Sequence, residues 1–432
     1  MGRLLPQGAE GVAEGSYFCD QMRLFYDGLI LFLRGAVRVG AWFSPKLSAF
    51  VKGRSKVFEQ LRAGVQSKPG PYIWIHCASL GEFEQGRPVI ESLRTSLPDH
   101  RILLSFFSPS GYEVRKNYDG ADIVCYLPWD TAGNARKFLS IVNPVLVIFV
   151  KYEYWHHYIF AVRKRAIPLV SISAIFRPQQ VYFKWYGSFY RSILRNVSHF
   201  FVQNKESQQL LTSIGINQHT HGGDTRFDRV VQIVRQAREV SVAAAFSNGK
   251  VILVAGSVWP DDFEALLPTI NEGRVRFIVA PHEISERFLS SMESSLRVSH
   301  IRFSQAKDAD VSSYNVLFVD NVGMLSSLYR YGKYAFVGGG FREGLHNILE
   351  AACYGVPVCF GNRAFSVYQE ATDLIAAKAA FAVGSSDELQ RTLGWLDQPD
   401  NYAQASKTAR EYVLGRTGAT DKIVSYCNQL LK

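Results

Sequence analysis

The sequence predicts an α/β protein built from two Rossmann-like domains, and two observations carry this prediction. From Pro71 onward, short apolar runs alternate with helical stretches, which is the pattern of doubly wound sheets. The chain has 432 residues, more than one hydrophobic core usually serves, so two domains are expected. A charged, apolar segment before Pro71 stands apart from this alternation and predicts a helix that associates with a membrane surface.

Two series of strands are expected. The first comprises Tyr72–His76, Ile102–Phe106, Asp122–Tyr126, Val145–Val150, Leu169–Ser173 and His199–Val202. The second comprises Val251–Ala255, Arg276–Ala280, Val316–Val319, Tyr334–Val337 and Val356–Phe360. We therefore predict an unassigned extension (1–21), a membrane-associating helix with a basic stretch (22–52), an N-terminal domain (53–229), a linker (230–250) and a C-terminal domain (251–432). Two such domains facing a cleft form the GT-B architecture.

Composition and charge narrow the class of protein. Hydrophobic residues make up 47% of the chain and exclude disorder, while six scattered cysteines without CxxC spacing indicate reduced thiols in a cytoplasmic protein. The net charge is +10. Residues 22–70 hold nine Lys and Arg against two acids, so most of this excess lies in one local surface. That distribution argues against a nucleic-acid partner. The sequence carries no signal for an oligomeric state.

Residues 24–43 predict a helix lying in a membrane interface. Asp27, Arg34 and Arg38 interrupt the apolar run, which is too broken for a spanning helix. At helical spacing these charges share one stripe with Arg23, and apolar residues including Phe25 lie opposite, as in interfacial helices. The alternative is an amphipathic helix packed on the protein's own core. The aromatic and basic stretch 181–191 is a second candidate for lipid contact, or a plain amphipathic helix.

A nucleotide site is predicted at residues 335–361. A strand runs into Gly338, Gly339 and Gly340, and a helix expected to start near Leu345 carries Glu350 one turn in. Glycines let backbone N–H groups approach an anion, a helix N-terminus adds partial positive charge, and a carboxylate accepts hydrogen bonds from a ribose diol. These features indicate a sugar-nucleotide enzyme.

The loop after the first strand predicts a catalytic carboxylate. It contains Ser79, Gly81 and Glu82, and ligands of open α/β sheets bind beyond the carboxyl ends of strands. Gly81 leaves space beside Glu82, and a carboxylate suffices as the base that deprotonates an acceptor hydroxyl. The alternative is an acid in the first turn of a helix, stabilised by the helix dipole.

Several other residues are candidates with open alternatives. Glu153 lines the cleft beside Lys151, or forms an ion pair at a strand end. Ser257 meets the nucleotide phosphate, and Asn347 acts in the same pocket or caps a helix. The pair His156–His157 lacks a third ligand at helical spacing, so no metal site is expected.

In the order of its motifs, the chain resembles the 3-deoxy-D-manno-octulosonic acid (Kdo) transferases that glycosylate the lipid A precursor. The matching motifs are W-I-H-x-x-S-x-G-E at Trp74–Glu82, E-x-W at Glu153–Trp155, F-V-Q-N-x-E-S at Phe201–Ser207, G-D-T-x-F-D at Gly223–Asp228, A-G-S at Ala255–Ser257, and H-N-x-x-E at His346–Glu350. The resemblance implies that Glu82 is the base and that Glu350 binds the ribose of CMP.

The chain also departs from the pattern of this family. The P-R-H segment reads Pro281-His282, so the arginine expected at the donor is missing and His282 or Arg287 is the expected substitute. The segment ending at Arg177 differs from the family's N-A-R-x-S, which alters an acceptor contact.

The function expected from the resemblance is inverting transfer of Kdo from CMP-Kdo to lipid IVA in lipopolysaccharide biosynthesis, without a cofactor or metal. The expected partners are CMP-Kdo, lipid IVA and an anionic membrane, and the expected location is the cytoplasmic face of the bacterial inner membrane. The alternatives are another GT-B enzyme that uses a UDP-sugar, such as a lipid glycosyltransferase or a 2-epimerase, and a non-catalytic membrane scaffold.

Overall fold

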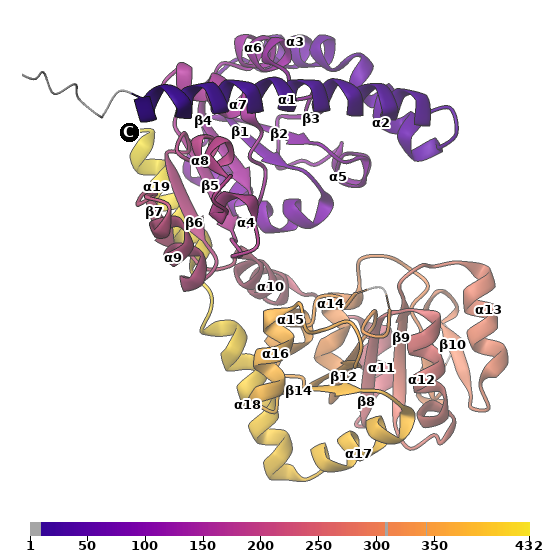
Figure 1. The fold of residues 1–432 in the computed structure, drawn as a ribbon. Helices are drawn as coiled ribbons and strands as arrows, with labels where there is room; N and C mark the ends of the chain where they lie inside the picture. Colours follow the sequence, from indigo (N-terminus) through magenta and orange to yellow (C-terminus); the bar gives the residue numbers. More distant parts are fainter. Residues whose placement is uncertain (1–9, 307–309, 343) are drawn as a thin grey trace, which may run out of the picture. The chain divides into compact units, whose positions relative to one another are not determined.

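The computed structural model describes residues 10–306, 310–342 and 344–432, and the chain divides into two compact units (Figure 1). The N-terminal unit comprises Met1–Arg229 and Thr417–Lys432, and the C-terminal unit comprises Val230–Arg416. Each unit is built on its own seven-stranded parallel sheet, so the expectation of two Rossmann-like domains of the GT-B type is confirmed. The predicted cleft between them stays a prediction.

The sheet of the N-terminal unit has the strand order β3-β2-β1-β4-β5-β6-β7. Its strands are β1 (Tyr72–Cys77), β2 (Arg101–Phe106), β3 (Ile123–Tyr126), β4 (Pro144–Val150), β5 (Leu169–Ala174), β6 (His199–Val202) and β7 (His219–His221). All neighbouring strands pair in parallel, with Trp74 opposite both Leu103 of β2 and Val147 of β4. The order reverses between β1 and β4, the point where open α/β sheets bind their ligands.

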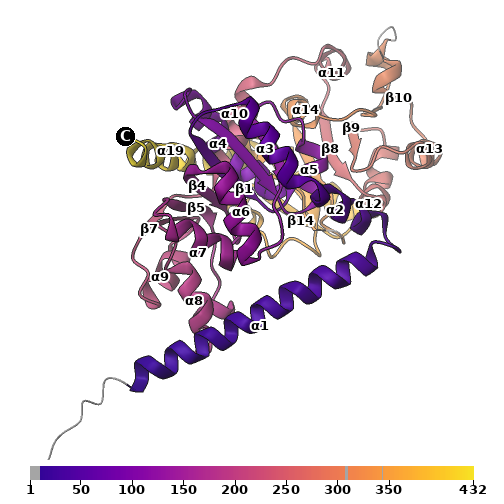
Figure 2. The ribbon, with the colours of Figure 1, turned by 90° about the horizontal axis from the view of Figure 1, so that it is seen from above.

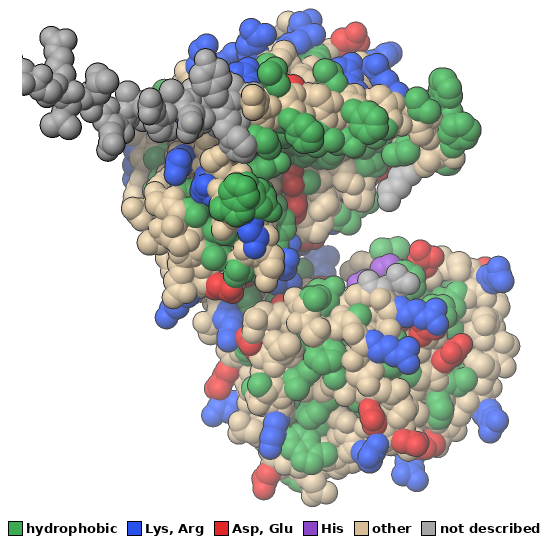
Figure 3. Space-filling view, in the orientation of Figure 1, with side chains coloured by type: hydrophobic (Ala, Val, Ile, Leu, Met, Phe, Trp, Pro, Cys, Tyr) green, Lys and Arg blue, Asp and Glu red, His purple; other side chains and the backbone are tan. Residues whose placement is uncertain are grey.

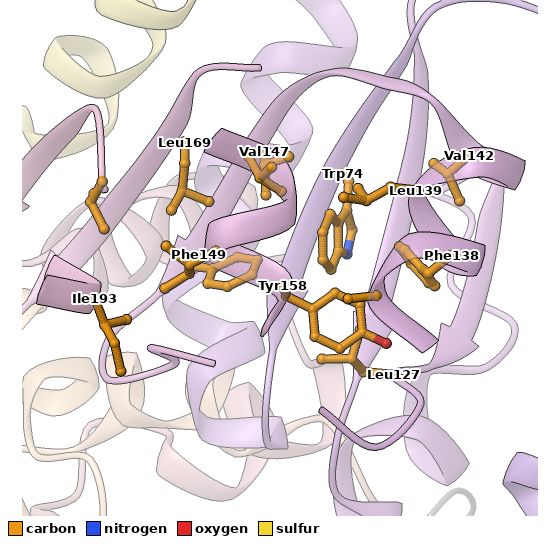
Figure 4. Close-up of a cluster of buried hydrophobic side chains, with 14 of the residues drawn as sticks. Trp74, Leu127, Phe138, Leu139, Val142, Val147, Phe149, Tyr158, Leu169 and Ile193 are labelled. Atoms are coloured by element: carbon orange, nitrogen blue, oxygen red, sulfur yellow. The ribbon is translucent and has the colours of Figure 1, made fainter. Parts of the chain in front are cut away.

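A cluster of aromatic and aliphatic side chains packs against one face of this sheet (Figure 4). The Trp74 ring lies 4.7 Å from Phe138, 5.2 Å from Phe149 and 5.6 Å from Tyr158, measured between ring centroids. The Trp74 indole N–H donates to the Ser105 hydroxyl (2.8 Å), so its one polar group is satisfied inside the core. This packing fixes β1 and β4, the two strands that lead into the candidate acceptor site.

The helices of this unit surround the sheet. They are α1 (Glu10–Gly40), α2 (Pro45–Ser55), α3 (Val57–Ser67), α4 (Leu80–Ser96), α5 (Pro109–Arg115), α6 (Ala132–Val142), α7 (His156–Lys164), α8 (Ser188–Leu194), α9 (Lys205–Ser213), the first part of α10 (Thr225–Gln236) and α19 (Ala419–Leu430). A 3-10 turn, η1 (Val181–Phe183), precedes α8.

Helix α1 runs beside α8 and leads into α2 (Figures 1 and 2). Of the expected extension 1–21, residues 1–9 lie outside the described part of the chain, and the helix already begins at Glu10. Ile30 is buried, whereas Phe25 and Phe32 are exposed. The alternative in which α1 packs its apolar face on the core is therefore wrong for these two side chains. Within the described residues, no helix combines the length and apolar character needed to cross a bilayer.

The sheet of the C-terminal unit has the order β10-β11-β9-β8-β12-β13-β14. Its strands are β8 (Ile252–Val258), β9 (Arg276–Pro281), β10 (His300–Arg302), β11 (Val316–Phe318), β12 (Tyr334–Val337), β13 (Val358–Gly361) and β14 (Ala380–Val383). Its helices are the end of α10, α11 (Ser241–Ser247), α12 (Pro260–Asn271), α13 (Glu286–Ser295), α14 (Leu325–Leu328), α15 (Leu349–Cys353), α16 (Gln369–Ala376), α17 (Ser386–Leu396) and α18 (Pro399–Leu414). The 3-10 turns are η2 (Phe303–Gln305), η3 (Val311–Ser313) and η4 (Tyr329–Tyr331). Here the order reverses between β8 and β12.

The end of the chain returns to the first unit, which corrects the expected C-terminal domain of 251–432. Helix α19 packs on α4 and buries Ile423 and Cys427 in the core beneath β1. The Asp228 carboxylate fixes the start of this segment by accepting from the Gly418 N–H (2.6 Å) and the Thr420 N–H (2.7 Å). The apolar face of α19 is thus used by the N-terminal sheet. The expected linker 230–250 also belongs to a unit, the C-terminal one, as the end of α10 and α11.

Candidate active site

Glu82 lies in the first turn of α4, directly after β1. The Ser79 hydroxyl caps this helix by accepting from the Glu82 N–H (3.5 Å), and the Glu82 carboxylate accepts from the Ala78 N–H (2.5 Å). A side chain added at Gly81 would meet open space, as expected for a substrate approach. Burial, followed by the negative charge of Glu153, raises the pKa of Glu82 to about 8. A carboxylate of raised pKa at a sheet's switch point is a candidate proton acceptor, although Glu82 also serves the helix start.

Glu153 follows β4, the strand adjacent to β1, and is held by two aromatic side chains. The Trp155 indole N–H donates to its Oε2 at 2.6 Å, and His76 Nε2 lies 3.4 Å from the same oxygen. The Ser105 hydroxyl lies 2.9 Å from His76 Nδ1. His76 Nδ1 also lies 3.1 Å from the Ser105 carbonyl oxygen, so both ring nitrogens have a polar neighbour. Glu153 is therefore a positioned carboxylate, and its expected ion pair with Lys151 is replaced by these contacts.

A group of charged residues surrounds the two glutamates. Lys151 has a left-handed backbone (φ +63°), and burial, followed by the nearby charge of Arg226, lowers its pKa. The negative charges of Asp224 and Glu82 oppose this shift by raising the pKa of Lys151. Asp224 is buried and accepts from the Arg226 guanidinium at 2.8 Å. The positive charge of Arg177 also acts on Lys151, so Arg177 belongs to this group. The site joins acids that can take a proton to cations that can attract an anionic acceptor.

The His156–His157 pair is part of a buried junction with α1. His157 Nε2 donates to the Asp27 carboxylate (2.5 Å), and the Tyr26 hydroxyl donates to the buried Asp130 (2.6 Å). Burial, followed by the charge of His157, lowers the pKa of His156 to about 4. Asp27 therefore faces the protein and not a headgroup layer. Within residues 10–306, 310–342 and 344–432, no cluster of three metal-ligating side chains occurs, and the expected independence from metal stays a prediction.

The three glycines of the C-terminal unit serve close backbone packing. A Cβ at Gly338 would lie 2.1 Å from the Ser257 carbonyl oxygen, and one at Gly340 would lie 2.5 Å from the Gly361 carbonyl oxygen. Gly339 has φ +88°, a conformation that favours glycine. The N–H of Gly338 donates to the Gly256 carbonyl, and that of Gly339 donates to Asp262 (both 2.9 Å). Two of the three expected anion donors are therefore occupied within the protein.

Asp262 organises this loop, and the sequence did not single it out. Its Oδ2 accepts from the Trp259 N–H and the Gly339 N–H, both at 2.9 Å, which joins the ends of β8 and β12. Its Oδ1 is buried and has no hydrogen-bond partner among the described residues, and burial raises the pKa of this carboxyl to about 6. A capping motif at α12 would have identified the first of these contacts. The contact with Gly339, 77 residues away, carries no local signal.

Two histidines and a tryptophan stack at the same edge. The Trp259 and His282 rings lie 4.2 Å apart, and the His282 and His346 rings lie 4.6 Å apart. The Trp259 indole N–H donates to His346 Nε2 (3.1 Å), and burial, followed by the charge of His282, lowers the pKa of His346 to about 4. The structure thus brings together His282 and His346, and Ser257 at the end of β8. Arg287 lies exposed in the first turn of α13.

The expected helix from Leu345 is shorter than predicted. Helix α15 begins at Leu349 and has five residues, so the argument from a helix dipole at the glycine loop is wrong. The Asn347 carboxamide donates to Glu350 (3.2 Å) and accepts from the Leu349 N–H (3.2 Å). Asn347 therefore serves the start of this short helix, as one of its two expected roles required, and orients the Glu350 carboxylate.

Comparison with known proteins shows which proteins the chain is similar to. The sequence model of "3-Deoxy-D-manno-octulosonic-acid transferase (kdotransferase)" matches residues 52–229. The 3-deoxy-D-manno-octulosonic acid transferase of Rickettsia felis is 27% identical over 83% of this chain and 78% of its own length. That of Bordetella pertussis is 26% identical over 83% of this chain and 88% of its own length. The chain is therefore similar to Kdo transferases over most of its length, and its residues 52–229 match their sequence model. It is a glycosyltransferase of lipopolysaccharide biosynthesis.

A comparison of folds gives a similar architecture among solved structures. The UDP-GlcNAc 2-epimerase of Neisseria meningitidis, solved with UDP-GlcNAc bound, matches with a TM-score of 0.59. The alignment covers 83% of this chain and all of the epimerase at 14% identity, so the likeness concerns the fold alone.

One residue of the C-terminal unit offers a cation that the sequence reasoning missed. Arg342, in the glycine loop, lines a cavity of about 190 Å³ together with Trp259, Asp262 and Gly339. Its guanidinium pairs with Asp261 at 2.6 Å and is largely exposed. Arg342 lies at this cavity, and Arg287 is not among the residues that line it. Arg342 is therefore a further candidate for the role of the arginine that is missing before His282.

Proposed function

We propose that this enzyme transfers Kdo from CMP-Kdo to lipid IVA with inversion at the anomeric carbon, and that Glu82 is the general base. The observation that carries the proposal is the buried Glu82 carboxylate of raised pKa, beside Glu153 at the β1/β4 switch point. A displacement with inversion needs one base, which takes the proton of the acceptor hydroxyl as its oxygen attacks. A general base works best when its pKa lies near the operating pH, and the raised pKa of Glu82 meets this condition better than an ordinary carboxylate does.

In this proposal, Glu153 keeps Glu82 in a state that binds a proton well. The Glu153 carboxylate is fixed by Trp155 and His76, and its charge disfavours ionisation of Glu82. Lys151 and Arg226 offset the accumulated negative charge and attract an acceptor that carries phosphates. Ser79, Gly81 and Arg177 complete the acceptor side.

The donor side is assigned to the C-terminal unit. The candidates lie at the carboxyl ends of β8, β9 and β12, where nucleotides bind in open sheets. They are Ser257, His282, Arg287, His346, Asn347 and Glu350, with Arg342 added. Glu350 is assigned to the ribose hydroxyls, and cations with backbone donors offset the charge that develops on CMP as it leaves. No metal is invoked in this mechanism.

The proposed location is the cytoplasmic face of the bacterial inner membrane, reached through α1. Figure 3 shows hydrophobic side chains gathered along α1 and toward α2. Trp42 and Phe43 are more than 80% exposed at the end of this helix, and Trp185, which precedes α8, is 91% exposed. Aromatic and basic side chains of this kind anchor proteins in the interfacial layer. The exposed aromatic residues support the second candidate surface, residues 181–191.

The test is incubation of the enzyme with CMP-Kdo and lipid IVA, followed by mass spectrometry of the lipid and NMR assignment of the new anomeric centre. We expect a mass increase of one or more Kdo units and an inverted linkage. Transfer from a UDP-sugar in place of CMP-Kdo, or a retained configuration, contradicts the proposal. Thermal-shift measurements with CMP and UDP separate the donors independently, because a bound ligand raises the melting temperature.

A further inference from the structure

A cavity of about 270 Å³ lies in the N-terminal unit, between α1, α2, the start of α3 and the segment that leads into α6. Its lining residues are Arg34, Val37, Arg38, Val51, Arg54, Ser55, Val57, Phe58, Pro128, Trp129 and Asn134. Three of these side chains carry guanidinium groups, and none carries a carboxylate. The remaining side chains are mostly apolar or aromatic. The cavity therefore combines concentrated positive charge with an apolar lining.

Arg54 supplies a positive charge that pairs with no carboxylate of the described residues. Its guanidinium donates to the backbone carbonyls of Leu127 (3.1 Å), Phe50 (3.0 Å) and Phe107, and it lies 3.6 Å from the centre of the Phe50 ring. Burial lowers the pKa of Arg54 to about 10, although a nearby anion would keep it high. These three bonds use three of its five N–H groups. The charge is thus fixed in place by neutral acceptors, and an anion in the cavity would stabilise it.

Arg34 and Arg38 bring two further cations to the cavity from α1. They are four residues apart and so lie on the same side of the helix. No ion pair or hydrogen bond of either guanidinium occurs among the residues that the structure describes. Both can therefore turn toward a ligand without breaking an internal contact.

The cavity lies beside exposed apolar side chains at the end of α1 and in the turn that follows it. Val37 and Arg38 line it, and Val39, Trp42 and Phe43 follow on the same segment with exposed fractions of 54%, 81% and 83%. An occupant with a phosphate in the cavity and an apolar tail can cover these side chains. A soluble anion leaves them in water. The combination fits a lipid better than a free phosphate.

We propose that this cavity binds the phosphate headgroup of an anionic bilayer phospholipid, and so fixes α1 on the membrane at a defined depth. Guanidinium groups suit phosphate oxygens because their parallel N–H groups match the geometry of a phosphate. The site goes beyond a general attraction of basic residues to the bilayer, which is worth about 1 kcal/mol for each Lys or Arg near the surface. It rests on the membrane association proposed above.

The first test is flotation of the full chain with vesicles of phosphatidylcholine alone or with 30% phosphatidylglycerol, the second composition being on the order of physiological anionic content. The cavity variant is Arg34→Gln with Arg38→Gln. The matched control is Lys52→Gln with Lys56→Gln, which removes the same charge from exposed residues that do not line the cavity. We expect the cavity variant to lose anionic-vesicle affinity at least about tenfold more than the control. Equal losses in the two variants overturn the proposal.

The second test separates charge from geometry and keeps the proposal decidable if the glutamine variant folds poorly. Arg34→Lys with Arg38→Lys keeps both charges and loses the forked donors, so we expect vesicle affinity to fall, whereas unchanged affinity overturns the proposal. Dihexanoyl phosphatidic acid below its micelle concentration should raise the melting temperature of the wild type more than inorganic phosphate does. An equal rise with both ligands assigns the cavity to free phosphate and overturns the lipid assignment.

Vesicle binding and Kdo transfer are measured on the same preparations, so the two proposals fail separately. If the wild type transfers Kdo, and the variant Arg34→Gln with Arg38→Gln binds vesicles as well as the wild type does, the headgroup site alone is contradicted. Wild-type protein that does not float with anionic vesicles contradicts both the site and the membrane association of α1.

Discussion

Replacing Glu82 by Gln should abolish transfer and yet stabilise the protein at alkaline pH. Folding moves the pKa of this carboxyl from an ordinary value of 4.5 to about 8 because the side chain is buried beside Glu153. Below pH 4.5 the Glu82 carboxyl is protonated in both the folded and the unfolded state, so its burial lowers the free energy of unfolding by nothing on account of charge. Between pH 4.5 and about 8 the unfolded chain is ionised while the folded chain holds its proton, so stability falls as pH rises. The full difference corresponds to about 5 kcal/mol.

The glutamine side chain carries no charge at any pH and still offers an oxygen to the Ala78 N–H. The variant should therefore gain free energy of unfolding relative to wild type between pH 5 and pH 9, up to about 5 kcal/mol. Urea denaturation at the two pH values measures this gain. Glu59→Gln, at an exposed position of α3, is the control and should show no such trend. A pH-independent difference, or a wild type that is more stable than the variant at pH 9, would refute the reasoning.

Three further predictions concern activity and stability. Glu153→Gln removes the negative charge beside Glu82, so the apparent pKa of the rising limb in the pH profile of kcat/KM should fall by about one pH unit. An unchanged rising limb would show that Glu153 does not influence the catalytic base. Gly339→Ala should lower the melting temperature and the affinity for CMP, because the backbone is left-handed and a Cβ would lie 2.3 Å from the Gly344 carbonyl oxygen. We expect a loss of stability of about 1–3 kcal/mol, and calorimetry that shows neither loss contradicts this prediction. Asp228→Ala should leave the N–H groups at the start of α19 unpaired and so destabilise the protein by about 1–3 kcal/mol in urea denaturation. A loss of stability below about 0.5 kcal/mol would contradict this role of Asp228.

The sequence predicted what is encoded locally. Strands such as β1 and β4 are continuous apolar runs in buried parallel sheets, so their positions follow from composition and turn residues. The short strands β7 (His219–His221) and β10 (His300–Arg302) were missed because three residues of mixed polarity carry no periodic signal. Strand β14 (Ala380–Val383) is apolar, but four apolar residues do not distinguish a strand from a buried helix segment.

The remaining differences arise from contacts between distant residues. His76 reaches Glu153 across two adjacent strands, 77 positions apart, and Asp262 reaches Gly339 over the same separation in sequence. The return of α19 to the first unit likewise depends on which core has space for Ile423. An apolar helix face indicates that a helix is packed, and it does not indicate on which sheet. The glycines follow β12 as expected, whereas the use of their N–H groups depends on tertiary partners, and their role at a nucleotide stays a prediction.

The most direct test of the central claim compares Glu82→Gln with Glu350→Ala in two assays, turnover of CMP-Kdo with lipid IVA and calorimetric binding of CMP. The account predicts that Glu82→Gln binds CMP as wild type does and loses turnover by about 10²–10⁴-fold, the usual contribution of a general base. It predicts that Glu350→Ala loses CMP affinity first. Near-normal turnover in Glu82→Gln, or undiminished CMP binding in Glu350→Ala, would contradict the division of roles between the two units.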